Sequence, residues 1–202
     1  MLIPASFILD DDGPVHPSYF LHPGWDLPLL VSNDFTRDYF AVLNENGVKG
    51  KFSVLAMPTC QGRLDESINY VPESHRKRFI REVREGVTPN HDLCPEILTH
   101  HAAYDLKTKR FLHIYEDVWM NQASSDEITD YISLALKILK NVGLMANGVT
   151  SPWSAGIKNE KAYVEGIGAR RSTCALAHGR VSKGWMTERW LVPMRCGRPG
   201  GL

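Results

Sequence analysis

FILDDDGP, residues 7–14, is a short apolar run that ends abruptly in three aspartates, a glycine and a proline. This pattern is typical of a buried β-strand that stops at a loop. The strand would place Asp10, Asp11 and Asp12 at its carboxyl end, where α/β sheets and barrels carry their functional sites. We therefore expect a first strand that delivers an acidic cluster to the edge of the domain.

A helix and a second strand follow this segment. Residues 14–32 are rich in proline and aromatic residues and are expected to form a long loop. Asp34 is expected to cap a helix, because apolar residues then recur at helical spacing over 35–43 and Gly47 supplies a stop. Residues 50–58, GKFSVLAMP, form the second strand. Strand, helix and strand in this order make a βαβ unit, which predicts a mainly parallel sheet.

The remaining elements continue this alternation. The clearest is a helix that begins at Ser124, where Glu127 follows with the spacing of a capping box. The patterns predict helices over 73–86, 124–143 and 160–168, strands over 93–98 and 148–153, and a short helix or loop between His100 and about Asp105.

One domain accounts for most of the 202 residues, and we expect it to span 1–168. Residues 169–202 differ, because arginine and glycine are frequent there and Glu188 is the only acid after residue 165. They show no sustained period of strand or helix. Two interpretations of this basic tail stay open: a loosely ordered segment, or a segment that is not the natural continuation of the domain.

The charge balance narrows the range of partners. Lysine plus arginine and aspartate plus glutamate number 23 each, so the formal net charge is zero. This balance favours neither nucleic acid nor an anionic membrane as a partner, and self-association stays open. The chain shows no basic leader and no run near the roughly 18 apolar residues of a membrane span, which predicts a cytoplasmic protein. The four cysteines form no CxxC pair and are expected to be reduced and partly buried.

The three aspartates of residues 10–12 are the first feature that carries chemistry. Adjacent carboxylates repel one another, and they become favourable if a cation lies among them or if one is protonated. Carboxylates alone suit Mg²⁺ or Ca²⁺, and carboxylates with histidines suit Zn²⁺, Mn²⁺ or Co²⁺. The alternative is a solvated turn, since Asp-Gly-Pro is common turn chemistry.

His100 and His101 are the second feature, because they also follow an apolar strand. Adjacent side chains on a strand point to opposite faces, so one of the two is expected to face the site. If a helix starts there, His100 would share a face with Tyr104, and His101 with Asp105. The alternative is one histidine hydrogen-bonded in the core and one exposed.

Aromatic residues near the predicted rim are the third feature. Pro152 stops a strand and Trp153 presents a large ring at its end, as does Trp25 in the long first loop. Exposed aromatic rings stack on sugars through their apolar faces, whereas the alternative for Trp153 is a place in the core.

Together these segments resemble the polysaccharide deacetylase superfamily. The resemblance lies in residues 9–14 (LDDDGP), residues 96–100 (EILTH) and the late Pro152-Trp153, and it extends over about residues 7–168. It implies an irregular (β/α) barrel, incomplete if the tail is not its natural continuation. It also implies removal of acetyl groups from N-acetylated sugars with a divalent metal ion.

Position by position, the resemblance implies that Asp11 is the general base and that Asp12 and His100 bind the metal. The family's second histidine falls at Tyr104 in this chain. Either His101 or Asp105 replaces it, or the metal is weakly bound or absent.

Two further motifs depart from the family. No arginine stands two residues before Pro152, and His178 matches the family's late Leu-x-His only in spacing. The resemblance is therefore stronger for the fold than for the activity.

The leading hypothesis is a metal-dependent hydrolase of the polysaccharide deacetylase type, which removes an acyl group from a carbohydrate. Its divalent ion would be Zn²⁺, Mn²⁺, Co²⁺ or Mg²⁺. The predicted residues are Asp11 as catalytic base, Asp12, His100 and His101 as metal ligands, and Trp153, Pro152, Trp25 and Tyr104 in substrate binding.

Two alternatives stay open. The chain is a non-catalytic carbohydrate-binding relative of the same fold, or it is a glycoside hydrolase-like barrel that pairs an aspartate of residues 10–12 with Glu96. The second is the weaker, because Glu96 is expected to lie too far back along its strand to reach the rim.

Overall fold

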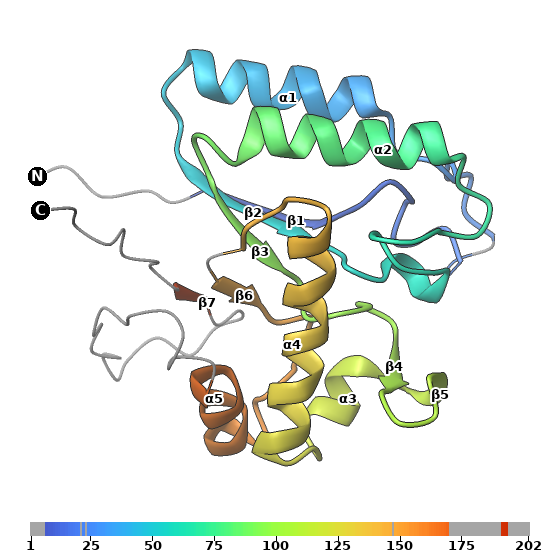
Figure 1. Cartoon of the computed structure of the whole chain (residues 1–202), viewed down its shortest axis with the longest axis vertical. Helices are drawn as coiled ribbons and strands as arrows, with labels where there is room; N and C mark the ends of the chain where they lie inside the picture. Colours follow the sequence, from blue (N-terminus) through green and yellow to red (C-terminus); the bar gives the residue numbers. More distant parts are fainter. Residues whose placement is uncertain (1–6, 21, 23, 147, 170–190, 194–202) are drawn as a thin grey trace, which may run out of the picture.

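A parallel three-stranded sheet in the order β1–β2–β3 lies at the centre of the structure (Figure 1). Both strand pairs are parallel, and helices α1 and α2 make the two crossovers. The bounds are β1 (Phe7–Asp12), α1 (Asn33–Glu45), β2 (Gly50–Val54), α2 (Glu73–Glu82) and β3 (Asp92–Pro95). The βαβ order and the parallel sheet predicted from the sequence are confirmed.

The structure is a computed structural model that describes residues 7–20, 22, 24–146, 148–169 and 191–193. Nearly all of the predicted tail at 169–202 lies outside the described residues, and His178 lies there too. Within the described part, no helix is long and apolar enough to cross a membrane.

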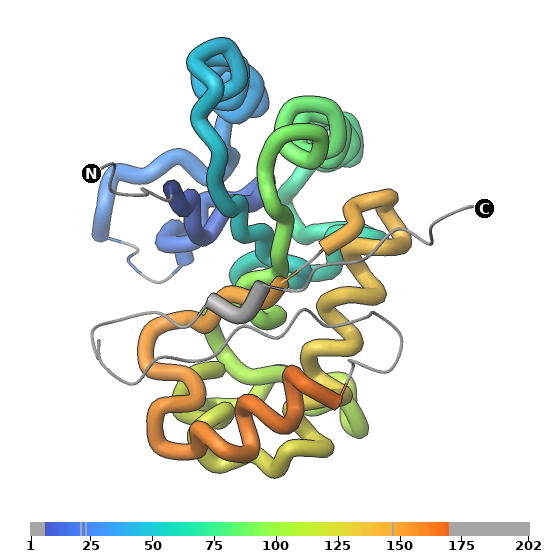
Figure 2. Tube along the Cα trace, turned by 90° about the vertical axis from the view of Figure 1, so that its left-hand side faces the viewer, coloured from blue at the N-terminus to red at the C-terminus, as the bar shows by residue number. Residues whose placement is uncertain are grey.

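Two groups of elements cover opposite sides of the central sheet. Helices α1 and α2 lie side by side over one face, and the remaining helices with a short hairpin lie on the other side (Figures 1 and 2). η2 (Val83–Val87) continues α2 and contacts α1, so it belongs with these two helices. The other elements are η1 (Pro58–Cys60), β4 (Ala102–Asp105), β5 (Arg110–Tyr115), α3 (Glu116–Met120), α4 (Ser125–Asn141), β6 (Gly148–Thr150), α5 (Glu160–Gly168) and β7 (Leu191–Pro193).

The sheet is open within the described residues. A single parallel bridge joins Glu96 to Thr150, so β6 lies next to the end of β3, and β7 pairs antiparallel with β6. On the other edge, β1 pairs with β2 alone in the described part of the chain. A barrel requires both edge strands to pair. The mixed α/β class is therefore confirmed, and the closure of the predicted barrel is not.

Two local predictions were wrong. Ser32, not Asp34, caps α1: its backbone is extended, and its hydroxyl accepts a hydrogen bond from Phe35 N at 3.4 Å. Asp34 lies inside the first turn, where it pairs with Arg37 and Arg78.

The short helix expected after His100 is a strand instead. In β4, Tyr104 pairs with Phe111 of β5 in an antiparallel hairpin. The helical pairing of His100 with Tyr104, and of His101 with Asp105, therefore does not occur. A segment of four residues has little intrinsic preference for strand or helix, so its pairing with β5 decides its conformation.

The capping box of α4 is confirmed. Ser124 Oγ accepts from Glu127 N at 3.3 Å, and Glu127 Oε2 accepts from Ser124 N at 2.9 Å. We expect Ser124→Ala to lower the free energy of unfolding by about 1 kcal/mol, because a helix N–H loses its partner. Urea denaturation would measure the change, with the neighbouring Ser125→Ala as the matched control. Equal losses in the two variants would contradict the cap.

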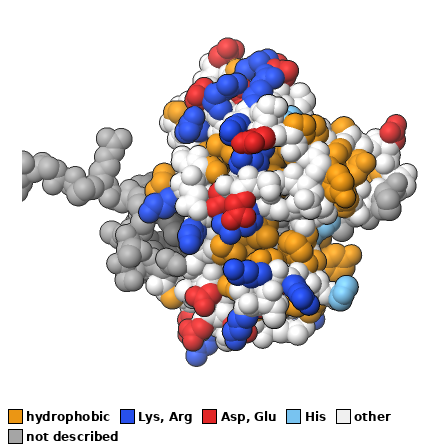
Figure 3. All heavy atoms as spheres, turned by 45° about the vertical axis from the view of Figure 1, so that its right-hand side comes forward, with side chains coloured by type: hydrophobic (Ala, Val, Ile, Leu, Met, Phe, Trp, Pro, Cys, Tyr) orange, Lys and Arg blue, Asp and Glu red, His pale blue; other side chains and the backbone are white. Residues whose placement is uncertain are grey.

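The surface shown in Figure 3 carries charges of both signs. Basic and acidic side chains lie close together on this face, and hydrophobic side chains gather between them and at the right-hand side. This face therefore presents no extended surface of a single charge, in keeping with the equal numbers of acids and bases in the chain.

Candidate functional site

An irregularity at the end of β1 sets the direction of the Asp11 side chain. Leu9 pairs with Phe52 and Asp12 with Val54, so β1 contains one residue more than β2 between these pairs. Such a bulge changes the aim of a side chain, and Asp11 has the left-handed φ of 61° that aspartate tolerates better than most residues. The bulge also frees the Asp11 N–H from the strand ladder.

That freed N–H donates to Glu96, which lies two strands away across the sheet. Asp11 N donates to Glu96 Oε2 at 2.9 Å, and Ser53 Oγ of β2 donates to the same oxygen at 2.7 Å. Glu96 directly follows β3 and is buried. Its carboxylate therefore bridges the carboxyl ends of all three parallel strands.

His100 comes back to Glu96 because the chain turns sharply after β3. Ile97 and His100 both have left-handed backbones, with φ of 44° and 60°. This conformation is strained for residues other than glycine, and such strain clusters at functional sites. We expected Glu96 to lie too far back along its strand to reach the site. This prediction was wrong, since His100 Nδ1 is 3.1 Å from Glu96 Oε1.

Asp11, Glu96 and His100 form one group whose ligand atoms all lie within 4.8 Å of one another. His100 Nδ1 is 3.4 Å from Asp11 Oδ1 and 3.1 Å from Glu96 Oε1, so the buried imidazole pairs with both carboxylates when it is protonated. Ligand atoms bound to Zn²⁺ at about 2.0–2.1 Å lie roughly 3.4 Å apart around a tetrahedron. The spacing and the mix of two carboxylates with one imidazole both fit a divalent transition-metal ion.

The ionisation of the three groups is coupled. Burial, together with the neighbouring Glu96, raises the pKa of Asp11 to about 7. Burial would raise the pKa of Glu96, but His100, Asp11 and Ser53 outweigh it and lower this pKa to about 2. Burial likewise opposes a charge on His100, yet the two carboxylates hold its pKa above the usual value. Negative charge is therefore favoured on Glu96 over Asp11, and the protonated form of His100 is favoured by both carboxylates.

The structure places two of the predicted metal ligands outside this group. Asp12 Oδ1 accepts from Gly13 N at 2.8 Å, and burial raises the pKa of Asp12 to about 7. His101 is buried, and burial lowers its pKa to about 4, with a smaller raising effect from the Pro17 carbonyl. Of the predicted set of Asp12, His100 and His101, His100 alone belongs to the group.

Trp153 lies against this group. Its ring centroid is 4.7 Å from that of His100, and the rings of Trp153 and Tyr115 meet edge to face at 5.7 Å. Both aromatic side chains are half exposed, Trp153 at 50% and Tyr115 at 55%. Trp153 is therefore at the surface and not in the core, whereas the preceding Pro152 is buried.

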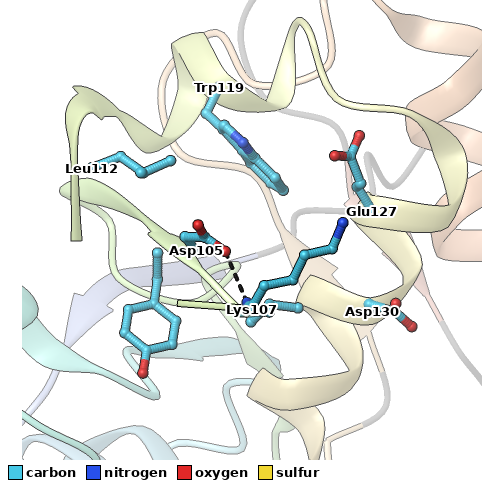
Figure 4. Close-up of a pocket in the computed structure, with 8 residues that line it drawn as sticks. Asp105, Lys107, Leu112, Trp119, Glu127 and Asp130 are labelled. Carbon is cyan, nitrogen blue, oxygen red and sulfur yellow. Dashed lines mark hydrogen bonds between the residues drawn. The ribbon is translucent and has the colours of Figure 1, made fainter. Parts of the chain in front are cut away.

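The other two predicted substrate residues lie elsewhere. Trp25 is exposed in the loop after β1, where it stacks on His22 at 4.2 Å. Tyr104 lines a pocket of about 290 Å³ between the β4–β5 hairpin and α3 and α4 (Figure 4). Two of the three acids that line this pocket serve local structure, since Asp105 accepts from Lys107 N and Glu127 caps α4.

Sequence reasoning missed two residues of the site, Ser53 and Tyr115, and underrated Glu96. A signal for Glu96 was present: it stands two residues after Cys94, so strand alternation places both on one face. Cys94 is the register partner of Ser53. These residues therefore face the same side of the sheet.

Cys60 and Cys94 are free thiols, as the sequence predicts, while Cys174 and Cys196 lie outside the described residues. Burial raises the pKa of Cys60 to about 12 and also raises that of Cys94. Because the thiolate is the nucleophile, we expect iodoacetamide at about pH 8 to leave both unmodified in the native protein and to label both in urea. Peptide mapping by mass spectrometry would measure this, and rapid native labelling of Cys60 would contradict it.

No protein-family model matches the chain, and no curated protein matches it. Among solved structures, the chain is similar to a mutant of a CE4 family pseudoenzyme with restored enzymatic activity. The identity is 14% and the TM-score 0.42, over 82% of this chain and 40% of that one. The chain thus spans less than half of the length of that structure.

Proposed function

We propose that the chain is a metal-dependent hydrolase that removes an acyl group from a carbohydrate, with Asp11, Glu96 and His100 around its metal ion. One observation supports this proposal most directly: three ligand atoms, from the end of β1 and from the turn after β3, lie within 4.8 Å of one another. The resemblance of LDDDGP and EILTH to motifs of polysaccharide deacetylases supports the acyl and carbohydrate parts. The irregular barrel belongs to the same proposal.

The three residues differ in exposure, and this suggests different roles. The side chains of Glu96 and His100 are 4% and 8% exposed, whereas that of Asp11 is 34% exposed. A divalent ion at this position supplies polarisation of the acyl carbonyl and a lowered pKa for bound water. Glu96 and His100 would hold the ion, and Asp11 beside it would be the member open to substrate. Asp11 would then take the proton from the attacking water.

The aromatic pair beside His100 supports a carbohydrate as substrate. Trp153 and Tyr115 present exposed rings at an edge-to-face angle of 89°. Aromatic rings of this kind stack on the apolar faces of sugar rings. This pair would hold the sugar next to Asp11.

Stacking of a sugar on Trp153 and Tyr115 needs no metal ion. The same aromatic pair therefore also favours the second candidate function, carbohydrate binding without catalysis. The glycoside hydrolase alternative is not favoured. Carboxyl groups in retaining glycosidases lie about 5–5.5 Å apart, and those of inverting enzymes lie roughly 6.5–9.5 Å apart. The nearest oxygens of Asp11 and Glu96 are within 4.8 Å, and both carboxylates contact His100.

Metal content and acetate release test the proposal together. Protein purified under metal-replete conditions should carry one divalent ion per chain and release acetate from N-acetylglucosamine oligomers. Asp11→Asn should lower this rate by about 100-fold or more, since general base catalysis contributes that much. The rate is expressed per bound ion, because Asp11 belongs to the three-residue group and its replacement also lowers the metal content.

The outcomes separate the two candidates. A bound ion without acetate release contradicts the hydrolase. Binding of the same oligomers that is lost in Trp153→Ala then supports the second candidate. A protein that binds neither ion nor oligomer contradicts both.

A further inference from the structure

We infer that Glu116 is a positioning residue, which holds the turn that carries His100 in place at the candidate metal centre. The inference rests on the proposed function for what His100 binds, and on the geometry alone for how His100 is held. Glu116 is the first residue of α3 and is fully buried. Neither its position in the sequence nor the resembled family motifs point to it.

The carboxylate of Glu116 accepts from three consecutive peptide groups. Glu116 Oε1 accepts from Leu98 N at 3.2 Å and from Thr99 N at 2.8 Å, and Oε2 accepts from His100 N at 2.8 Å. Three N–H groups of one turn therefore converge on one side chain, as in the backbone concavities that bind anions.

This turn is the strained one. The left-handed residue Ile97 directly precedes the three residues that contact Glu116, and the left-handed His100 is the last of those three. A β-branched residue such as isoleucine rarely adopts this conformation, and it persists only where the surroundings enforce it. The three hydrogen bonds to the buried carboxyl group of Glu116 are the enforcing contacts.

A second buried side chain fixes the carboxylate itself. The Tyr131 hydroxyl of α4 donates to Glu116 Oε1 at 2.9 Å and accepts from Tyr104 N at 3.0 Å. Glu116 N in turn donates to His101 O at 2.6 Å. Glu116 thus contacts both ends of the turn and α4, and Tyr131 links it to β4. Within the described part of the chain, its side chain meets four hydrogen-bond donors and no acceptor.

Four donors around one carboxylate make glutamine an informative replacement. Glu116→Gln keeps the size of the side chain but replaces one oxygen with an amide donor. If the amide faces the Oε1 side, it meets three donors, and if it faces the Oε2 side, it meets His100 N alone. The second orientation is the less costly, and it releases the turn at His100. Tyr131→Phe is the milder change, since it removes one donor and keeps the packing.

Two measurements test the inference. The first is amide hydrogen exchange by NMR in metal-free protein, at Leu98, Thr99 and His100. The second is Zn²⁺ affinity by calorimetry. For Glu116→Gln we expect faster exchange at these amides and a Zn²⁺ affinity about 10- to 100-fold lower, as for residues that orient metal ligands elsewhere. Tyr131→Phe should show the same changes at smaller size.

The matched control is Tyr163→Phe, which removes another buried hydroxyl that bonds to Ser151 and not to the turn. It should change neither quantity. Unchanged exchange and affinity in Glu116→Gln overturn the inference, as do equal changes in the control. If Glu116→Gln does not fold, Tyr131→Phe decides by the same criteria. If the wild type binds no Zn²⁺, the proposed function fails, while faster exchange in the variants still supports the role of Glu116 in holding His100.

Discussion

His100→Ala is expected to lower the affinity for Zn²⁺ by about 100-fold or more. Replacing a residue that merely orients a metal ligand already lowers metal affinity about 10- to 100-fold. His100 Nδ1 contributes the one nitrogen of the three-atom group and lies within 3.4 Å of both partners. Its loss leaves two carboxylates that repel each other. Calorimetry with Zn²⁺ measures the effect, and circular dichroism of the variant checks that it folds.

The companion variants separate two ligand sets. The sequence predicts Asp12, His100 and His101 as ligands, whereas the structure brings His100 together with Asp11 and Glu96. Glu96→Gln should therefore weaken Zn²⁺ binding strongly, and Asp12→Asn should leave it nearly unchanged. The reverse result would show that the resembled motif predicts the ligands better than the geometry does.

The second large effect concerns stability. Phe52→Ala is expected to lower the free energy of unfolding by about 3–5 kcal/mol, the usual cost of truncating a buried aromatic residue. Phe52 is fully buried in β2 and meets Phe40 of α1 edge to face, with centroids 4.8 Å apart. Since a domain is stable by only about 5–15 kcal/mol, this loss is a large share of the total.

Urea denaturation measures this loss, and Phe35→Ala provides the matched control. Phe35 lies on the same helix as Phe40 but is 59% exposed, so its truncation should change the free energy of unfolding by less than about 0.5 kcal/mol. Similar losses in the two variants would contradict the packing of α1 on the sheet. The double variant of Phe52 and Phe40 should lose less than the sum of the single variants, because the two rings are in contact.

Much of the local structure could be predicted from short patterns. The strand at residues 7–12, the helix after Ser124 and the order of the βαβ units each follow from a run of a few residues whose period or caps are distinctive. The hairpin at β4 and β5 could not be predicted in this way. Its four-residue first strand is decided by a partner further along the chain.

The choice between Asp11 and Asp12 as metal ligand could not be predicted from the sequence either. Alternation along a regular strand cannot say which of Asp11 and Asp12 faces His100, because a single extra residue reverses the two faces. The bulge at Asp11 is that extra residue, and it appears only when β1 pairs with β2. Glu96 was underrated for a similar reason, since the turn at Ile97 that returns His100 to it has no sequence signature.

The sequence by itself determined that FILDDDGP ends a strand with an acidic cluster, that the sheet is parallel, and that His100 follows another strand of it. Parallel strands place their carboxyl ends at one edge, so these residues were bound to be neighbours. The tertiary structure alone decided which atoms meet: Asp11 in place of Asp12, Glu96 as the bridging carboxylate, and Glu116 beneath the turn. The physical reason is that strand order follows from local patterns, whereas side-chain direction at a strand end depends on bulges, left-handed residues and buried partners distant in the chain.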